Sequence, residues 1–318
     1  MLNRRHIRAK TMQELYAMER ANENDLEKSI KRLNENLHNI YKLYILLLDL
    51  LVQIKRAEKD LIERRKKKFF KNEEDARPNL KMINNRLLNI LENNYSLQKA
   101  TEKYKSEKIW DFEKEIVLHL LDKIKASSYY KEYMARPGYN FEQDKQFLLD
   151  IYKNIIAPDE KLRESLEDKE INWADDLAIA NTMVMKTLGE IYENQSPGKE
   201  LPSLFKKEDD AHFGRDLLIR TWQNADRLKE MIGQKTINWD LERLSNIDRL
   251  LMMMALAEFL FFPEIPETAT INEYVEIAKE YSQPQSRKFI NGILDRLYKE
   301  LNEKQMIHKV QKSKNSPL

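Results

Sequence analysis

The chain has 318 residues, of which 34% are charged and 42% are hydrophobic, and it contains only 6 glycines and no cysteine. This composition is typical of a soluble, helix-rich protein, and the lack of cysteine excludes disulfides, thiolate metal sites and cysteine nucleophiles. The 55 basic and 53 acidic residues give a formal net charge of +2, so any affinity for nucleic acid must come from local patches.

Periodic apolar residues predict a succession of helices over the first two thirds of the chain. The expected helices cover residues 4–19, 26–54 with a charged continuation over 56–71, 80–97, 108–134, 141–156, 159–166 and 173–192. Pro78 separates two of them, because proline donates no backbone hydrogen bond and restricts the residue before it. Pro137 and Gly138 end another.

The chain shows no signal for export or membrane insertion. Basic residues begin at Arg4, and they are not followed by an apolar segment of the kind found in secretory signals. The apolar run over residues 44–52 contains Asp49 and is much shorter than the roughly 20 residues that span a bilayer. We therefore expect a cytoplasmic protein without a membrane span.

Proline and glycine between residues 195 and 202 mark the clearest internal boundary. They predict an N-terminal helical region over residues 1–204, a C-terminal helical domain over 205–302 and a polar, disordered tail over 303–318. Further helices are expected at 209–221, 223–232, 240–262, 271–281 and 286–301. The predicted fold class is all-α.

The segment 250–262 is apolar at every position except Glu258, which predicts a helix at the centre of a bundle. Glu258 has no second acid or ligand cluster beside it in the sequence. It is therefore interpreted as a buried hydrogen-bond acceptor rather than as an acid of an active site. Asp248 and Arg249 are interpreted in the same way, as an interhelix ion pair or a cap.

Local signals also predict how the last two helices begin. Thr270 and Glu273 have capping-box spacing, which predicts a helix starting at Ile271. Ser286 is the expected N-cap of the last helix. Gly292 lies inside that helix at a cost of about 1 kcal/mol relative to alanine, which indicates close approach of another backbone.

Several short sequence elements in the last third occur in a distinctive order. They are FGRDLL at 213–218, WDLERL at 239–244, DR at 248–249, AE at 257–258, IP at 265–266, INE at 271–273, AK at 278–279 and FINGILD at 289–295. Together with Arg4, Arg5, Arg8 and QELY at 13–16, they resemble the NusB family of transcription antitermination factors.

This resemblance implies an all-helical fold of two small bundles with no enzymatic activity. It also implies binding of single-stranded, boxA-type RNA together with NusE, a ribosomal protein of the small subunit. Through other Nus factors, such a complex joins the RNA polymerase elongation complex and supports ribosomal RNA transcription. Tyr16 and Phe213 are much further apart here than in shorter members, so residues 20–205 are either an enlarged first bundle or an accessory domain.

The basic first helix is the first candidate RNA site. Arg4, Arg5, Arg8 and Lys10 precede any acidic residue, and arginine both contacts phosphates and stacks on unpaired bases. A basic helix end can also be merely solvated, but the family resemblance favours RNA contact. Tyr16 fits either the core or a stacking platform.

A second cluster, at residues 64–71, contains five consecutive cations followed by two phenylalanines and a lysine. Its candidate RNA-binding residues are Arg64, Arg65 and Lys67. The alternative is a solvated helix end that the phenylalanines anchor to the core.

No pattern indicates catalysis, a metal or a cofactor. The five histidines lack ligand spacing, and Asp175 and Asp176 are neighbours on a helix that face different ways, so they are interpreted as capping or solubilising residues. Nucleotide-binding and hydrolase motifs are absent. Two alternatives remain: a helical interaction scaffold without RNA binding, and an accessory module of an RNA-modifying enzyme.

Overall fold

The computed structural model describes residues 2–67, 78–138, 140–234 and 245–310. Within these ranges every regular element is a helix, and the one β-type pairing is an isolated parallel bridge between Leu2 and Phe205. The predicted all-α fold class is therefore confirmed.

The chain folds as two compact units. The bipartite unit consists of residues 2–37 and the chain from 205 onward, and the inserted unit consists of residues 38–204. The sequence predicts a different division, with one N-terminal region over residues 1–204. The contacts instead place residues 2–37 with the C-terminal helices, because the apolar face of the first helix is buried against them.

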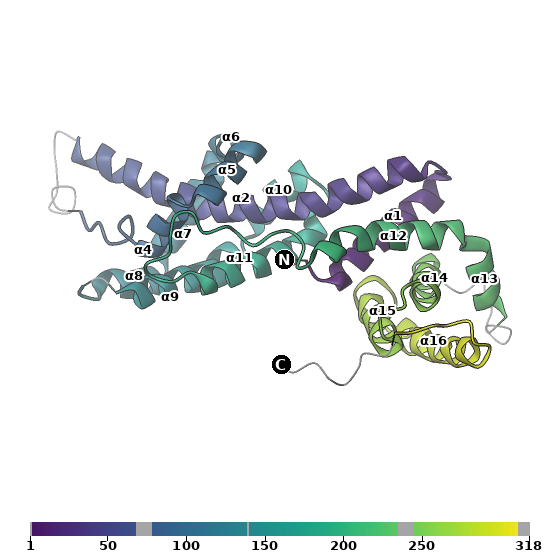
Figure 1. Cartoon of the computed structure of the whole chain (residues 1–318). Coiled ribbons are helices and arrows are strands. Elements are labelled where there is room, and N and C mark those ends of the chain that lie inside the picture. Colours follow the sequence, from purple (N-terminus) through teal and green to yellow (C-terminus); the bar gives the residue numbers. More distant parts are fainter. Residues whose placement is uncertain (1, 68–77, 139, 235–244, 311–318) are drawn as a thin grey trace. The chain divides into compact units, whose positions relative to one another are not determined.

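The bipartite unit is a bundle around one central helix, α14 (Asn246–Phe261). Its other elements are α1 (Arg4–Ala21), the first part of α2 (Leu26–Lys66), α12 (Glu208–Gln223), α13 (Ala225–Gly233), α15 (Glu267–Tyr281) and α16 (Ser286–Glu303). All residues of α14 from Leu250 to Phe259 are buried, which confirms the prediction of a helix surrounded by others. Figure 1 shows α1, in purple, beside α12, in green.

The inserted unit contains the rest of α2 and the helices that follow it. They are α4 (Arg86–Glu92), α5 (Tyr95–Tyr104), α6 (Ser106–Phe112), α7 (Lys114–Ala126), α8 (Ser128–Ala135), α9 (Phe141–Ile151), the π-helix η1 (Tyr152–Ile156), α10 (Glu160–Lys169) and α11 (Trp173–Glu190).

Two expected long helices of the inserted unit are broken into shorter ones. The segment 80–97 is interrupted because the side chains of Asn85 and Asn94 accept backbone N–H groups and begin α4 and α5. The segment 108–134 is interrupted at Glu113 and again at Ser127, whose hydroxyl caps α8. Apolar periodicity does not report such breaks, because the apolar face continues across them.

Helix α2 is long and apolar enough to span a membrane by length and composition alone. Of its most apolar window, however, 72% is buried inside the protein, which is the pattern of a core helix. The buried Asp49 belongs to this stretch. Its carboxylate accepts hydrogen bonds from Ser106 and from Gln53, and burial raises its pKa.

The predicted start of the helix at Ile271 and the predicted capping roles of Thr270 and Ser286 are wrong. Helix α15 begins at Glu267 with Pro266 as its N-cap, so Thr270 lies inside the helix and donates its hydroxyl proton to Glu258 at 3.1 Å. Ser286 is the first residue of α16 and donates to Asp248 at 2.7 Å instead of capping. In both cases the hydroxyl donates a hydrogen bond to a carboxylate of α14 and does not cap its own helix.

The expected close approach at Gly292 is also wrong, because no atom lies within 4 Å of the position that a Cβ would take there. The tight glycine is Gly214 on α12, where a Cβ would come within 2.7 Å of Cγ2 of Ile7 on α1. Absence of a side chain at this position is what lets the two helices pack closely.

Residues 303–310, which the sequence predicts to belong to a disordered tail, are ordered against the rest of the bipartite unit. Residue Glu303 ends α16, Ile307 is buried, and the ammonium of Lys309 donates to the backbone carbonyls of Glu258 and Phe262, each at 2.9 Å. The segment 303–310 therefore packs on the end of α14. Residues 311–318 lie outside the described part of the chain.

Candidate RNA-binding surface

The first turn of α1 is fixed by a capping box. The side chain of Asn3 accepts the backbone N–H of His6 at 3.1 Å, and Nδ1 of His6 accepts the backbone N–H of Asn3 at 3.4 Å. This second bond requires a neutral imidazole. Burial, aided by the positive charge of Arg5, lowers the pKa of His6 to about 4.

Arg8 lies in the interior of the bipartite unit. Its Nε donates to Oε1 of Glu258 at 2.6 Å and its Nη2 donates to Oε2 at 2.9 Å. The same carboxylate accepts from Thr270 and from the phenol of Tyr274, which is 2.6 Å from Oε1. Burial lowers the pKa of the Arg8 guanidinium, but the charge and the hydrogen bonds of Glu258, together with smaller effects of Tyr274 and Glu273, raise it by more in sum. The sequence predicts that Arg8 contacts RNA, but its side chain is only 3% exposed. In this structure the guanidinium faces Glu258 and not solvent.

Arg4 and Arg5 reach the surface at the start of α1, and each is held by an acidic residue from a distant part of the chain. Nε of Arg4 donates to Asp210 at 2.8 Å. Arg5 donates through Nε and Nη2 to the two carboxylate oxygens of Glu273, at 2.8 and 3.1 Å. The side chains of Arg4 and Arg5 are 28% and 37% exposed.

The two remaining candidates on α1 differ in exposure. Lys10 is buried, whereas Tyr16 is exposed on the surface of α1. The part of the predicted α1 site that faces solvent is therefore Arg4, Arg5 and Tyr16.

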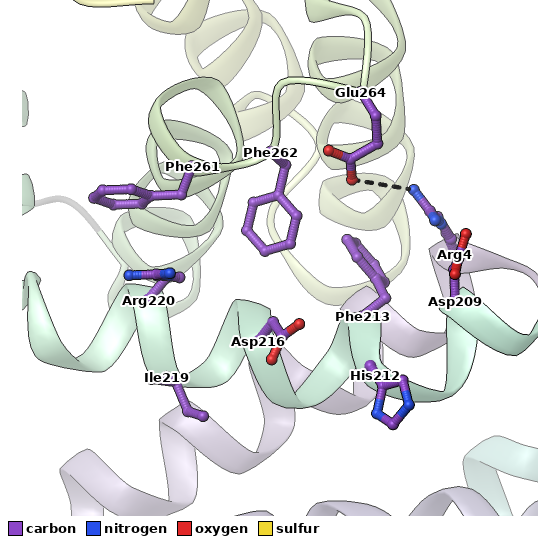
Figure 2. Close-up of a pocket in the computed structure, with 10 residues that line it drawn as sticks. All are labelled: Arg4, Asp209, His212, Phe213, Asp216, Ile219, Arg220, Phe261, Phe262 and Glu264. Atoms are coloured by element: carbon purple, nitrogen blue, oxygen red, sulfur yellow. Dashed lines mark ion pairs between the residues drawn. The ribbon is translucent and has the colours of Figure 1, made fainter.

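A surface pocket of about 590 Å³ lies beside Arg4 in the bipartite unit. Figure 2 shows its lining from α12 on one side and from the end of α14 and the following loop on the other. The guanidinium of Arg220 lies 5.5 Å from the ring centre of Phe261. Three carboxylates line the pocket, those of Asp209, Asp216 and Glu264, and Glu264 is 3.8 Å from Nη1 of Arg4.

The second predicted cluster belongs to the inserted unit. Arg64 and Arg65 lie in the last turn of α2 and Lys67 follows it, and all three are exposed. The rest of that cluster, residues 68–71, lies outside the described residues, as do residues 239–244 of the family resemblance.

The sequence did not predict that the arginines of α1 form ion pairs. Their partners are Asp210, Glu258 and Glu273. Each is more than 200 residues from its arginine in the sequence. Glu258 and Glu273 do occur in the short elements that resemble the NusB family, which is the one signal that pointed at them.

Comparison with known proteins agrees with these observations. The family model described as NusB family matches residues 176–299. The transcription antitermination protein NusB of Desulfatibacillum aliphaticivorans is 33% identical over 135 residues, which is 41% of this chain and 94% of that protein. The chain belongs to the NusB family.

Two further NusB proteins match over less of their length. The NusB protein of Chloroherpeton thalassium is 44% identical over 87 residues, which is 27% of this chain and 41% of that relative. A solved structure of T. maritima NusB is 29% identical, with 43% of this chain and 85% of that one covered and a TM-score of 0.28. The chain is longer than these NusB proteins and has an additional region.

Proposed function

We propose that this protein is a cytoplasmic, non-enzymatic transcription antitermination factor that binds single-stranded, boxA-type RNA together with a NusE-type ribosomal protein. Through other Nus factors it joins the RNA polymerase elongation complex and supports ribosomal RNA transcription. The observation that carries this proposal is the composition of the bipartite unit. It unites residues 2–37 with the chain from 205 onward, and these are the two separate segments that resemble NusB.

Arg4, Arg5 and Tyr16 are the residues of α1 that we assign to RNA contact. Arginine can bind phosphate bidentately or stack on a base, and an exposed tyrosine offers a stacking face. Arg5 uses Nε and Nη2 for Glu273, so its other N–H groups are available to a phosphate. Arg8 is a positioning residue in this proposal, because its buried pair with Glu258 fixes the helix that carries the contacts.

The carboxylates beside Arg4 and Arg5 oppose the binding of a phosphate group, because they repel its negative charge. A phosphate that approaches Arg5 also approaches Glu273, so RNA must compensate for that repulsion through contacts along its length. This arrangement favours an extended strand over a single phosphate group.

We propose that the NusE-type partner binds the bipartite unit at the pocket of Figure 2. The aromatic rings of Phe213, Phe261 and Phe262 supply an apolar floor, and three carboxylates line the same pocket. A protein that itself binds ribosomal RNA presents basic side chains, which these carboxylates complement.

The test is RNA binding with and without a NusE-type partner, using a boxA RNA and the same nucleotides in shuffled order. Arg4→Gln and Arg5→Gln are expected to weaken binding of the boxA RNA. Arg296→Gln is the matched control, because Arg296 is exposed on α16 and forms no ion pair among the described residues. Equal binding of boxA and shuffled RNA by the wild type, with partner present, overturns the proposal.

A scaffold without RNA binding is the second candidate, and one observation favours it. Each arginine of the first two turns of α1 already has a carboxylate partner. Retained binding of the ribosomal-protein partner, with no binding of boxA RNA, is the result expected for a scaffold.

A further inference from the structure

Charge is distributed unevenly along the inserted unit. Residues 38–136 contain 22 basic and 15 acidic residues, whereas residues 137–204 contain 7 basic and 14 acidic residues. The unit as a whole is therefore neutral, but its first part is basic. A polyanion is attracted to local charge of this kind, even when the net charge is zero.

The basic residues concentrate where α2 ends. Arg64, Arg65 and Lys66 form its last turn and Lys67 follows, and all four side chains are exposed. None of the four forms an ion pair with any residue that the structure describes. This is the opposite of α1, where Arg4, Arg5 and Arg8 are each held by a carboxylate.

One aromatic residue of α8, Tyr130, lies close enough to this end of α2 for the charges of Glu58 and Arg65 to act on its phenol. The pKa of Tyr130 is raised to about 12 by burial and by Glu58, while the charge of Arg65 opposes that rise. Lys125 binds Glu58 at 2.6 Å and fixes α7 on the same stretch of α2. Tyr129, next to Tyr130 in the first turn of α8, has 37% of its surface exposed.

We propose that the basic end of α2, residues Arg64 to Lys67 with α8 beside it, is a second RNA-contacting surface that binds the phosphate backbone of single-stranded RNA without sequence preference. It would bind RNA that flanks the element held by the bipartite unit. The inference rests on the proposed function in one respect, namely that the bipartite unit brings an RNA strand to the protein.

The geometry of the cluster favours a flexible polyanion over an acidic protein surface. Successive residues on a helix are about 100° apart, so four consecutive cations point in different directions around the end of α2. A flat acidic surface reaches only some of them at once. A single strand of RNA can bend around the helix end and bring successive phosphates to cations that point in different directions.

Two RNA-binding surfaces in one chain bind a single RNA more tightly than either surface alone. Once the bipartite unit holds the RNA, the second contact becomes intramolecular and takes place at a high effective concentration. Even weak phosphate contacts by the end of α2 then lower the overall Kd. The effect is expected only for RNA long enough to reach both units.

The experiment uses the full chain and two RNAs, a boxA-only RNA and the same RNA extended on both sides by unstructured uridine tracts. The test variant replaces Arg64, Arg65, Lys66 and Lys67 by glutamine, which preserves helix propensity. The control variant replaces Lys153, Lys161, Arg163 and Lys186 by glutamine, which removes the same charge from exposed sites of the acidic part of the inserted unit. Circular dichroism checks that both variants fold.

The readout is the slope of log K against log salt concentration. Each phosphate contact to a single strand contributes about 0.7 to that slope, so losing four contacts lowers it by up to about 3. The test variant is expected to show this loss on the extended RNA and not on the boxA-only RNA, and the control variant on neither. An unchanged slope for the test variant on the extended RNA overturns the inference.

The two proposals fail in distinguishable ways. If the wild type binds extended boxA and extended shuffled RNA equally, and the test variant still loses slope on both, the proposed function fails and the inference stands. If the test variant binds RNA as the wild type does but loses binding to polyglutamate, the surface takes an acidic protein and the inference is overturned.

Discussion

The guanidinium of Arg8 and the carboxylate of Glu258 form a buried bidentate ion pair, with N–O distances of 2.6 and 2.9 Å, that joins α1 to α14. The two residues are 250 positions apart in the sequence. Tyr274 and Thr270 complete the hydrogen bonding of the same carboxylate from α15. The basic first helix of this protein is thus attached to the central helix through one of the arginines that the sequence assigned to RNA.

Arg8→Met is expected to destabilise the protein strongly. It leaves the buried charge of Glu258 without its partner, and breaking one side of a buried ion pair typically costs about 3–5 kcal/mol. The free energy of unfolding from urea titration measures this change. The double variant Arg8→Met/Glu258→Leu is expected to lose less than the sum of the two single variants, because no unpaired charge remains.

Gly214→Ala and Gly292→Ala are expected to shift stability in opposite directions. At Gly214 the new methyl group would come within 2.7 Å of a branched, buried side chain, that of Ile7, and relieving such a clash costs about 1–3 kcal/mol. At Gly292 there is open space, so alanine gains up to about 1 kcal/mol of helix propensity. Thermal unfolding of both variants checks the signs, and a stabilised Gly214→Ala protein contradicts the close packing of α1 on α12.

Glu273→Gln is expected to strengthen binding of the boxA RNA. It removes the carboxylate that holds Arg5 and repels phosphate, while the amide still accepts a hydrogen bond from the guanidinium. Because both side chains are partly exposed, the loss of stability is expected to be below about 1 kcal/mol. The Kd for RNA is the measurement, and Arg5→Gln in the same assay is expected to change it in the opposite direction. Weaker RNA binding by Glu273→Gln would falsify the competition between the carboxylate and RNA.

Stability is expected to fall when the pH is lowered from about 6.5 toward 4, in part because of His6. Its pKa of about 4 in the folded protein lies below the ordinary value of 6.5, so the unfolded chain binds the proton first. The contribution is fully present above 6.5 and is lost through the folded pKa, and it amounts to about 3 kcal/mol at most.

His6→Gln tests that assignment. Glutamine at this position can complete the capping box with Asn3 but does not titrate. Urea unfolding at pH 7 and pH 5 is expected to show a smaller difference in the free energy of unfolding for the variant than for the wild type. Equal differences for the two proteins rule out His6 as the source of the pH dependence.

The sequence predicted best those features that depend on neighbouring residues. Apolar periodicity located α1, α9 and α11, and the uninterrupted apolar run 250–262 identified α14 as a central helix. These predictions succeeded because a helix face is defined by residues three and four apart. Capping failed at Thr270 and Ser286, because a hydroxyl binds whichever acceptor lies closest in the folded chain, and here those acceptors are Glu258 and Asp248.

The candidate site shows the same division. Four cationic residues in the first helix are visible in the sequence, but which of them faces solvent is not. The periodic pattern of the sequence does not distinguish Arg8 from the other cations of the helix. Arg8 is buried because α1 packs against α14. The exposure of Arg4, Arg5 and Tyr16 was likewise decided by the helices that cover the rest of α1.

The sequence by itself determined that this protein is helical, that its last third has the ordered elements of the NusB family, and where its cations cluster. The tertiary structure decided that residues 2–37 complete the bundle that begins again at Phe205, with residues 38–204 folding as a unit between them. The physical reason is that burial and ion pairing act between surfaces that meet only after folding. Sequence spacing carries no information on a partner such as Glu258, which lies 250 residues from Arg8.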